Sequence, residues 1–164
     1  MISRETVENL KLSALINLYC SVNIPLLGFI TPRVVELTDT RSEVRVRLDR
    51  RSRNHLKVMY FGALAMGAEL SIALRAITAI RESGRRIDFI FQNFSAEFLK
   101  RADGHVHFVC EEAADVSALI EEAANSDERL AKKFNGYAYV PRNGPEPIMK
   151  YTLTLSVKNR SKKK

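Results

Sequence analysis

The segment RNHLKVMYFGALAMGAEL, residues 53–70, decides the fold of this chain. Its apolar part continues to Leu74, is rich in alanine and glycine, and carries one charged residue, Glu69. Such a run predicts a helix over roughly 58–80 that is buried on most of its sides. Its small side chains allow close approach of other backbone. Gly67, which costs a helix interior about 1 kcal/mol relative to alanine, indicates a tight contact there.

The sequence before this helix changes from helical to strand periodicity. Residues 5–20 place apolar side chains at helical spacing, and Pro25 and Gly28 can open and end a short helical turn. Residues 32–49 alternate between apolar and charged side chains. We therefore expect an N-terminal helix, a helical turn and then a β-hairpin that turns near residues 39–41.

The sequence after the central helix is mostly of strand type. Ser83-Gly84 should end the helix. Residues 101–104 have the composition of a hairpin turn, and 115–133 have the pattern of a helix or a helical pair. The predicted strands are 87–100, 105–112, 136–140 and 147–158. This order predicts an α+β fold, with an antiparallel sheet wrapped around the long helix.

Length and composition indicate a single domain. The chain has 164 residues, of which 46% are hydrophobic and 27% charged, as in a soluble globular protein. We expect one domain over 1–164, with a helical extension at 1–30 and a basic tail at 159–164. Cys20 and Cys110 form no CxxC pair, so neither a disulfide framework nor a zinc site is expected.

Charge and targeting signals narrow the possible partners. The net charge of +7 suits anionic ligands, but the basic residues form no stripe with interleaved aromatics, so we expect no nucleic-acid partner. The N-terminal MISRETVENLK lacks the basic start and apolar core of a secretory signal. The central run is short for a bilayer and holds a carboxylate, which argues against a membrane span. We expect a cytoplasmic protein.

Glu69 has two interpretations. It could be a structural carboxylate, paired with an arginine or turned toward water. Alternatively, it could be a catalytic carboxylate in an apolar cleft, where desolvation would raise its pKa toward the range useful for a general base.

The residues around Glu69 resemble a known motif. Asn54 lies in the loop before the helix, Tyr60-Phe61-Gly62 occupies the place of a His-Gly-Gly, and Glu69 follows Gly62 by seven residues. In this pattern the chain resembles the hotdog-fold thioesterase superfamily, particularly the phenylacetate-pathway type of acyl-CoA thioesterase and an uncharacterised branch near it. The resemblance implies a hotdog fold and hydrolysis of acyl-CoA thioesters, with coenzyme A as part of the substrate and no other cofactor. The N-terminal helix and the helical stretch 115–133 are additions to that fold.

The resemblance also implies roles for the motif residues. The Phe61 N–H, at the start of the helix, would polarise the thioester carbonyl, and Gly62 would allow close approach. Glu69 would act as general base on water or as nucleophile, and Asn54 would orient the water or the thioester. Tyr60 stands where the family has a histidine.

Other residues are candidates for binding the substrate. These are His55 and Tyr60 beside the motif, and Lys100 and Arg101 for the phosphates of coenzyme A, with the loop arginines Arg50, Arg51 and Arg53 as alternatives. His55 also suits a hydrogen bond within its own loop. The N-terminal segment could line an acyl pocket with Leu15, Ile16, Leu26 and Leu27.

The spacing of the motif predicts a dimer. Phe61 and Glu69 are eight residues apart, about 12 Å along a helix at 1.5 Å per residue. They cannot serve one carbonyl from the same helix, so two subunits must supply them. We expect a homodimer or a dimer of dimers that binds an acyl-CoA or acyl-carrier thioester.

Three alternatives remain open. The altered His-Gly motif favours a non-catalytic protein that binds an acyl group or acyl-CoA. A hydratase would need an Asp/His pair, and only His55 is near. The third is a purely structural dimer, in which Glu69 would be salt-bridged and no pocket would exist. His105 and His107 face the same way on one strand, but two ligands are too few for a metal site.

Overall fold

The computed structural model describes residues 4–161. The chain begins with two helices, α1 (Arg4–Asn23) and α2 (Pro25–Phe29). Both were predicted from helical spacing and from Pro25, which stands in the first turn of α2.

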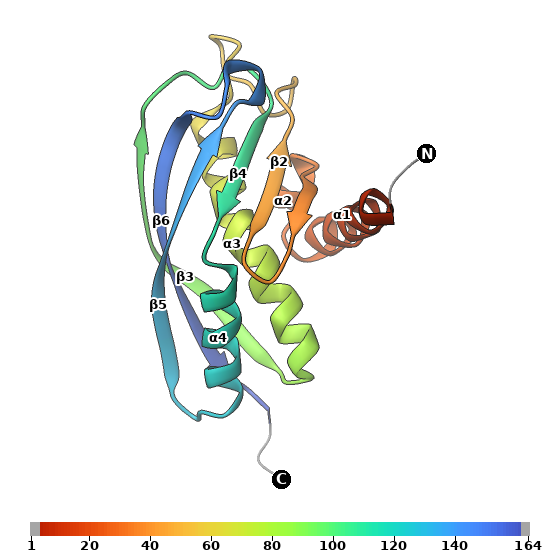
Figure 1. The fold of residues 1–164 in the computed structure, drawn as a ribbon, viewed down its shortest axis with the longest axis vertical. Coiled ribbons are helices and arrows are strands. Elements are labelled where there is room, and N and C mark those ends of the chain that lie inside the picture. The colour runs from red at the N-terminus through yellow and green to blue at the C-terminus, as the bar shows by residue number, and fades with distance from the viewer. Residues whose placement is uncertain (1–3, 162–164) are drawn as a thin grey trace.

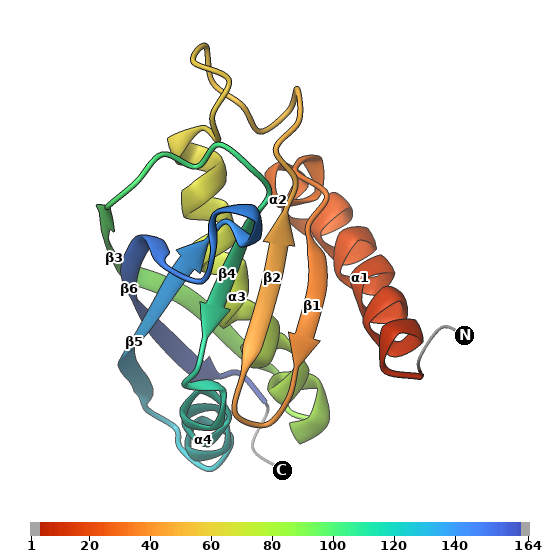
Figure 2. The same ribbon diagram turned by 45° about the horizontal axis from the view of Figure 1, so that its top comes forward.

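Helix α1 covers one edge of the sheet, the outside of the first strand (Figure 2). The Ser13 hydroxyl accepts a hydrogen bond from the Val34 N–H at 2.9 Å, and the Asn9 side chain donates to the Val35 carbonyl at 2.7 Å. These bonds satisfy backbone groups that an edge strand would otherwise leave unpaired.

Six antiparallel strands form one sheet in the order β1-β2-β4-β5-β6-β3. In chain order they are β1 (Arg33–Leu37), β2 (Ser42–Val46), β3 (Ile87–Phe98), β4 (Val106–Cys110), β5 (Arg129–Tyr139) and β6 (Pro147–Asn159). The predicted hairpin is confirmed, since β1 pairs with β2 and the Thr38 N–H closes the turn on the Arg41 carbonyl at 2.8 Å. The sheet curves around helix α3 (Figure 1), which confirms the α+β arrangement.

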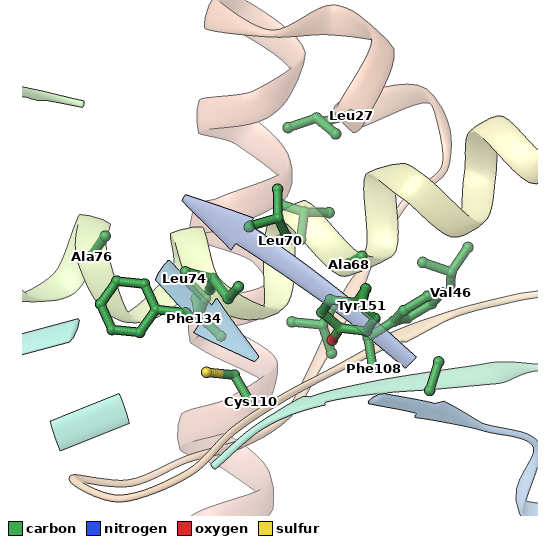
Figure 3. Close-up of a cluster of buried hydrophobic side chains, with 14 of the residues drawn as sticks. Leu27, Val46, Ala68, Leu70, Leu74, Ala76, Phe108, Cys110, Phe134 and Tyr151 are labelled. Atoms are coloured by element: carbon green, nitrogen blue, oxygen red, sulfur yellow. The ribbon is translucent and has the colours of Figure 1, made fainter. Parts of the chain in front are cut away.

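Helix α3 (Phe61–Ser83) is the core helix that the apolar run predicted. Figure 3 shows its side chains among those of the sheet, with Leu70 and Leu74 close to Phe108, Phe134 and Tyr151. All five side chains are at most 2% exposed. By length and composition α3 could cross a membrane, but 61% of its most apolar window is buried inside the protein.

Two glycines and the loop before the helix explain how α3 packs and where it begins and ends. The tight contact predicted at Gly67 is present, because an added Cβ would lie 2.3 Å from Phe108 Cε2. Gly84 ends the helix with a φ of 62°, a left-handed conformation that glycine adopts without strain. The helix begins at Phe61 rather than near residue 58. Met59 instead donates its N–H to the Ala102 carbonyl at 2.8 Å and forms an isolated bridge with Arg53, while residues 55–58 form a turn.

The predicted hairpin turn at 101–104 is wrong. Strand β3 pairs along its length with β6, while β4 lies between β2 and β5. The segment between β3 and β4 therefore crosses the end of the sheet. Turn composition could not reveal this, because the partner of β3 lies about fifty residues further along the chain.

The predicted helix at 115–133 is shorter than expected. Helix α4 (Ala113–Ala124) is present as an insertion between β4 and β5. The residues from Arg129 onward belong to β5, where they pair with β6 rather than extend the helix. A short 3-10 helix, η1 (Pro141–Asn143), lies between β5 and β6.

The basic tail is partly built into the sheet. Strand β6 continues to Asn159, and the Arg160 N–H donates to the Arg86 carbonyl at 2.7 Å. The Arg160 guanidinium pairs with Asp88 at 3.1 Å. This first part of the tail is therefore held against the sheet, and residues 162–164 lie outside the described residues.

Candidate active site

Glu69 lines a cleft between α3 and the free edge of the sheet. The cleft has a volume of about 570 Å³. Its other lining residues are mostly apolar and come from α1, the segment after it, α3, β3 and β6: Tyr19, Ile24, Ala65, Met66, Phe89, Ile90, Phe91, Phe94 and Leu153. A single carboxylate in such a wall is suited to an acyl group lying beside a polar reacting centre.

Glu69 has no ion-pair or hydrogen-bond partner among residues 6–161, where side chains are described. Burial in the apolar wall raises the pKa of the Glu69 carboxyl. A single copy of the chain therefore does not support the interpretation that Glu69 is a structural carboxylate paired with an arginine.

The start of α3 is exposed and aromatic. The first hydrogen bond of the helix runs from the Leu64 N–H to the Tyr60 carbonyl at 3.0 Å. It leaves the Phe61 and Gly62 N–H groups at the positive end of the helix dipole. The Tyr60 ring lies over Gly62, where an added Cβ would be 2.5 Å from its Cε1. Because Tyr60 is 52% exposed, its ring could turn aside for a ligand.

Asn54 organises the loop before α3. Its side-chain oxygen accepts hydrogen bonds from the Leu56 N–H at 2.9 Å and the Val58 N–H at 3.3 Å. Its oxygen is thus occupied by the loop, and only its NH₂ group remains to contact a ligand. His55 is exposed next to it.

Lys100 and Arg101 lie at the end of the molecule where α3 begins. The hydrogen bond between Met59 and Ala102 joins the two segments, and Figure 1 shows their loops at the same end. Lys100 is held by an exposed ion pair with Glu146, while the Arg101 side chain is exposed. The alternative Arg51 pairs instead with Asp49 at 3.2 Å.

The acyl-pocket lining predicted on the N-terminal segment is wrong in detail. Ile16 and Leu27 are buried in the core at 4% and 3% exposure. The same segment reaches the Glu69 cleft through Tyr19 and Ile24 instead. The helical spacing identified the apolar residues, but not which of them turn toward the cleft.

A polar cluster on the outer face of the sheet was not predicted. The buried carboxylate of Glu43 accepts hydrogen bonds from Tyr139 at 2.9 Å and Arg41 at 2.7 Å, and it lies 2.6 Å from His107 Nδ1. Burial opposes ionisation of Glu43, but these three partners outweigh it and lower its pKa to about 2. The only signal in the sequence was that polar residues alternate on each strand, and this did not show which strands are neighbours.

Comparison with known proteins gives a family and a fold. The sequence family described as "Domain of unknown function (DUF4442)" matches residues 13–133. No curated protein matches the chain.

Solved structures with the same architecture include several thioesterases. A protein of unknown function from Chlorobaculum tepidum has a TM-score of 0.76 at 9% identity, covering 92% of this chain and 96% of that one. A thioesterase from Haemophilus influenzae has a TM-score of 0.65 at 17% identity, covering 88% of each chain. A thioesterase family protein from Silicibacter pomeroyi has a TM-score of 0.64 at 18% identity, covering 90% of this chain and 98% of that one. The chain therefore has the hotdog fold of the thioesterases that it resembles.

Proposed function

The protein belongs to the DUF4442 family, a domain of unknown function, and we propose that it hydrolyses acyl-CoA thioesters with Glu69 at a dimer interface. The observation that carries this proposal is the state of Glu69. An acid without a partner in an apolar cleft lowers the stability of the protein, because ionising it costs desolvation energy that nothing repays. A raised pKa is, however, what a general base working near neutral pH requires.

The dimer is supported by the free edge of the sheet. Strand β3 is 12 residues long and forms the edge of the sheet that none of the helices within residues 4–161 covers. It exposes large apolar side chains, with Ile90 at 53%, Phe94 at 38% and Phe98 at 48%. A long apolar edge strand is a site for pairing with another strand, and the occupant proposed here is β3 of a second copy.

Pairing through β3 would complete the site. Two β3 strands related by a twofold axis run antiparallel, so the end of one lies toward the beginning of the other. The start of the partner's α3 would then approach the Glu69 cleft, which its own Phe61 cannot reach. This meets the requirement that the carbonyl donor and the carboxylate come from different subunits.

The chemistry needs only groups of this chain and water. Glu69 takes a proton from water while the water oxygen forms a bond to the thioester carbon. The carbonyl oxygen becomes negative and is stabilised by the Phe61 N–H of the other subunit. The carbon–sulfur bond then breaks, and the thiolate leaves with the proton that Glu69 took from water, which returns Glu69 to its ionised form. In the nucleophilic variant, Glu69 attacks the carbon directly and water hydrolyses the resulting anhydride.

Binding roles follow from position. The NH₂ group of Asn54 would orient the thioester or the water, since its oxygen already serves the loop. Tyr60 and His55 would border the entry. Lys100 and Arg101 would meet the phosphates of coenzyme A, and Lys100 would exchange its exposed partner Glu146 for them.

The test is release of free thiol from short, long and aromatic acyl-CoAs. Wild type is compared with Glu69→Gln and with Glu121→Gln, which removes an exposed carboxylate from α4. We expect turnover in wild type and in Glu121→Gln, and a loss of at least about a hundredfold in Glu69→Gln, as for removal of a general base. Equal rates in both variants would remove Glu69 from the mechanism.

A second candidate is a non-catalytic protein that binds acyl groups or acyl-CoA. The placement of Tyr60 favours it, because its ring covers the helix start that would hold the oxyanion. Saturable binding of acyl-CoA without thiol release from any substrate would establish this function instead.

A further inference from the structure

A second hollow lies on the outer face of the sheet, on a different set of strands from the Glu69 cleft. It has a volume of about 280 Å³. It is lined by Arg45 of β2, by His105 just before β4 and His107 within β4, and by Val140, Pro141 and Arg142 after β5. Four of these six residues carry basic side chains. Nothing in the thioesterase proposal uses them.

Arg45, which lines this hollow, has two other arginines, Arg33 and Arg47, as neighbours. Arg45 stands directly opposite Arg33 in the pairing of β1 with β2, and like charges in such a pair destabilise a sheet. Burial, and then the charges of Arg33 and Arg47, lower the pKa of Arg45. Within residues 6–161 none of the three forms an ion pair.

Arg45 also has an unused donor. Its Nε is buried without a hydrogen-bond partner in the described structure. A buried donor left unpaired is costly, so a ligand that accepts this hydrogen would be favoured. The nearby carboxylate of Glu43 does not serve, because its oxygens are taken by Arg41, His107 and Tyr139.

The two histidines are held in fixed orientations. His105 Nδ1 accepts a hydrogen bond from the Leu48 N–H at 3.1 Å, so the neutral ring carries its hydrogen on Nε2 as a donor. His107 is oriented by its contact with ionised Glu43 at 2.6 Å, which makes Nδ1 the donor there. A metal is not favoured, because the described residues hold no group of three or more potential ligands.

We infer that this outer-face hollow is a binding site for a phosphate group. Arg45 and the His105 Nε2–H supply donors, and Arg142 can add a guanidinium by exchanging its exposed partner Asp103, now at 2.9 Å. Guanidinium groups match the geometry and charge of phosphate oxygens. A phosphate would also relieve the repulsion between Arg45 and Arg33. The inference does not depend on Glu69 or on thioester hydrolysis.

The histidines make the binding measurable by NMR. The chain has three histidines, so the ring signals can be assigned with His55→Gln. Inorganic phosphate is titrated at constant ionic strength, with acetate as the comparison anion. We expect saturable shifts of the His105 and His107 rings with phosphate, and no shift of His55. Linear shifts, or equal shifts with acetate, would overturn the inference.

Variants locate the site. Arg45→Gln and, separately, the exposed Arg142→Gln should each weaken phosphate binding by roughly tenfold, as expected for losing one charge-assisted contact. Arg85→Gln, an equal change of charge after α3, should bind like wild type. Unchanged binding in both hollow variants would overturn the inference, and Arg142→Gln keeps the test valid if Arg45→Gln does not fold.

Two further ligands distinguish whether the phosphate bound in this hollow belongs to coenzyme A or is free inorganic phosphate. Coenzyme A and dephospho-coenzyme A are titrated in the same way. Tighter binding of coenzyme A than of its dephospho form, lost in Arg45→Gln, would assign the hollow to the nucleotide phosphate. Binding of inorganic phosphate at least as tight as that of coenzyme A would assign it to free phosphate. In Glu69→Gln the affinity for inorganic phosphate should be unchanged, because Glu69 does not line this hollow.

Discussion

The ring of Phe61, at the start of α3, meets the ring of Phe98, at the end of β3, edge to face with 6.1 Å between centroids. The helix and the strand therefore run antiparallel from a common level. Glu69 lies about 12 Å further along the helix, which corresponds to about four residues of strand, near Phe94. Phe94 does line the Glu69 cleft. For the partner's Phe61 to reach that level, the twofold axis must pass midway between residues 94 and 98.

A cysteine at residue 96 should therefore join two subunits. In Ala96→Cys the two thiols would face each other across the axis within the range of a disulfide. The native Cys20 and Cys110 are both buried and should not interfere. We expect a covalent dimer on non-reducing gels after mild oxidation.

Asn93→Cys is the control on the same strand. Its two cysteines would lie about 20 Å apart across the axis at 3.3 Å per residue and should remain unlinked. A crosslink in Asn93→Cys alone would show that the twofold axis passes near residue 93 instead of residue 96. The absence of a crosslink in both variants would contradict pairing through β3.

Glu69→Gln should make the protein more stable at neutral pH while removing activity. The pKa of Glu69 is raised in the folded protein, so the folded state binds its proton more tightly than the unfolded state does. Its contribution to stability is greatest below the pKa of the unfolded chain and is lost as pH rises through the folded pKa. Glutamine keeps the shape without the charge. Thermal unfolding at one protein concentration should show a higher Tm for the variant at pH 7 and a smaller difference at pH 4. A lower Tm at pH 7 would indicate a partner that stabilises the charged form.

The thioesterase activity of the wild-type protein should rise with pH. If Glu69 is the base, kcat/KM should increase with pH and level off above the pKa of its carboxyl, which burial raises from its ordinary value. Thiol release measured across acid and neutral pH tests this. Full activity below the ordinary pKa of a glutamate would exclude Glu69 as the base.

Gly67→Ala should destabilise the protein although alanine favours helix. The new Cβ would lie 2.3 Å from a ring carbon of Phe108, a side chain that is fully buried and cannot move aside. The clash should cost about 1–3 kcal/mol, which exceeds the gain in helix propensity of about 1 kcal/mol. Chemical denaturation of both proteins measures the difference.

Gly62→Ala is the matched control on the same helix. The three atoms nearest to its added Cβ all belong to the exposed ring of Tyr60, which can rotate. We expect little loss of stability, and a cost equal to that of Gly67→Ala would show that crowding by Phe108 is not the cause.

Glu43→Gln should lower the free energy of unfolding by about 3 kcal/mol at neutral pH, because it leaves the partly buried Arg41, His107 and Tyr139 without their carboxylate. The folded pKa of Glu43 is about 2, below the ordinary value of 4.5. Its stabilisation is therefore complete above pH 4.5 and is lost as pH falls toward 2. Urea unfolding at pH 7 and pH 3 should give a smaller difference between variant and wild type at the lower pH. A difference that does not depend on pH would show that the charge of Glu43 is not responsible.

Local pattern was sufficient for the elements whose signal lies within one segment. The apolar run around Glu69 predicted a buried helix, Gly84 its end, and Gly67 a close contact, because burial and backbone freedom depend on the residue types themselves. The hairpin at residues 39–41 followed for the same reason, since its two strands are neighbours in the chain.

Pairing between distant segments could be decided only by the tertiary structure. The turn expected at 101–104 was wrong because β3 pairs with β6, and residues 129–133 became strand because β6 offered them partners. Strand pairing is stabilised by hydrogen bonds and side-chain contacts that do not exist until remote segments meet.

The same division holds for the two sites. The sequence alone marked Glu69, because a carboxylate in an apolar run is unusual wherever the helix lies. It could not show that the carboxylate lines a cleft without a partner, or that Arg45, His105 and Arg142 share one hollow. Those facts depend on the order of strands in the sheet and on where α1 and α3 lie against it, which only the packing of the whole chain determines.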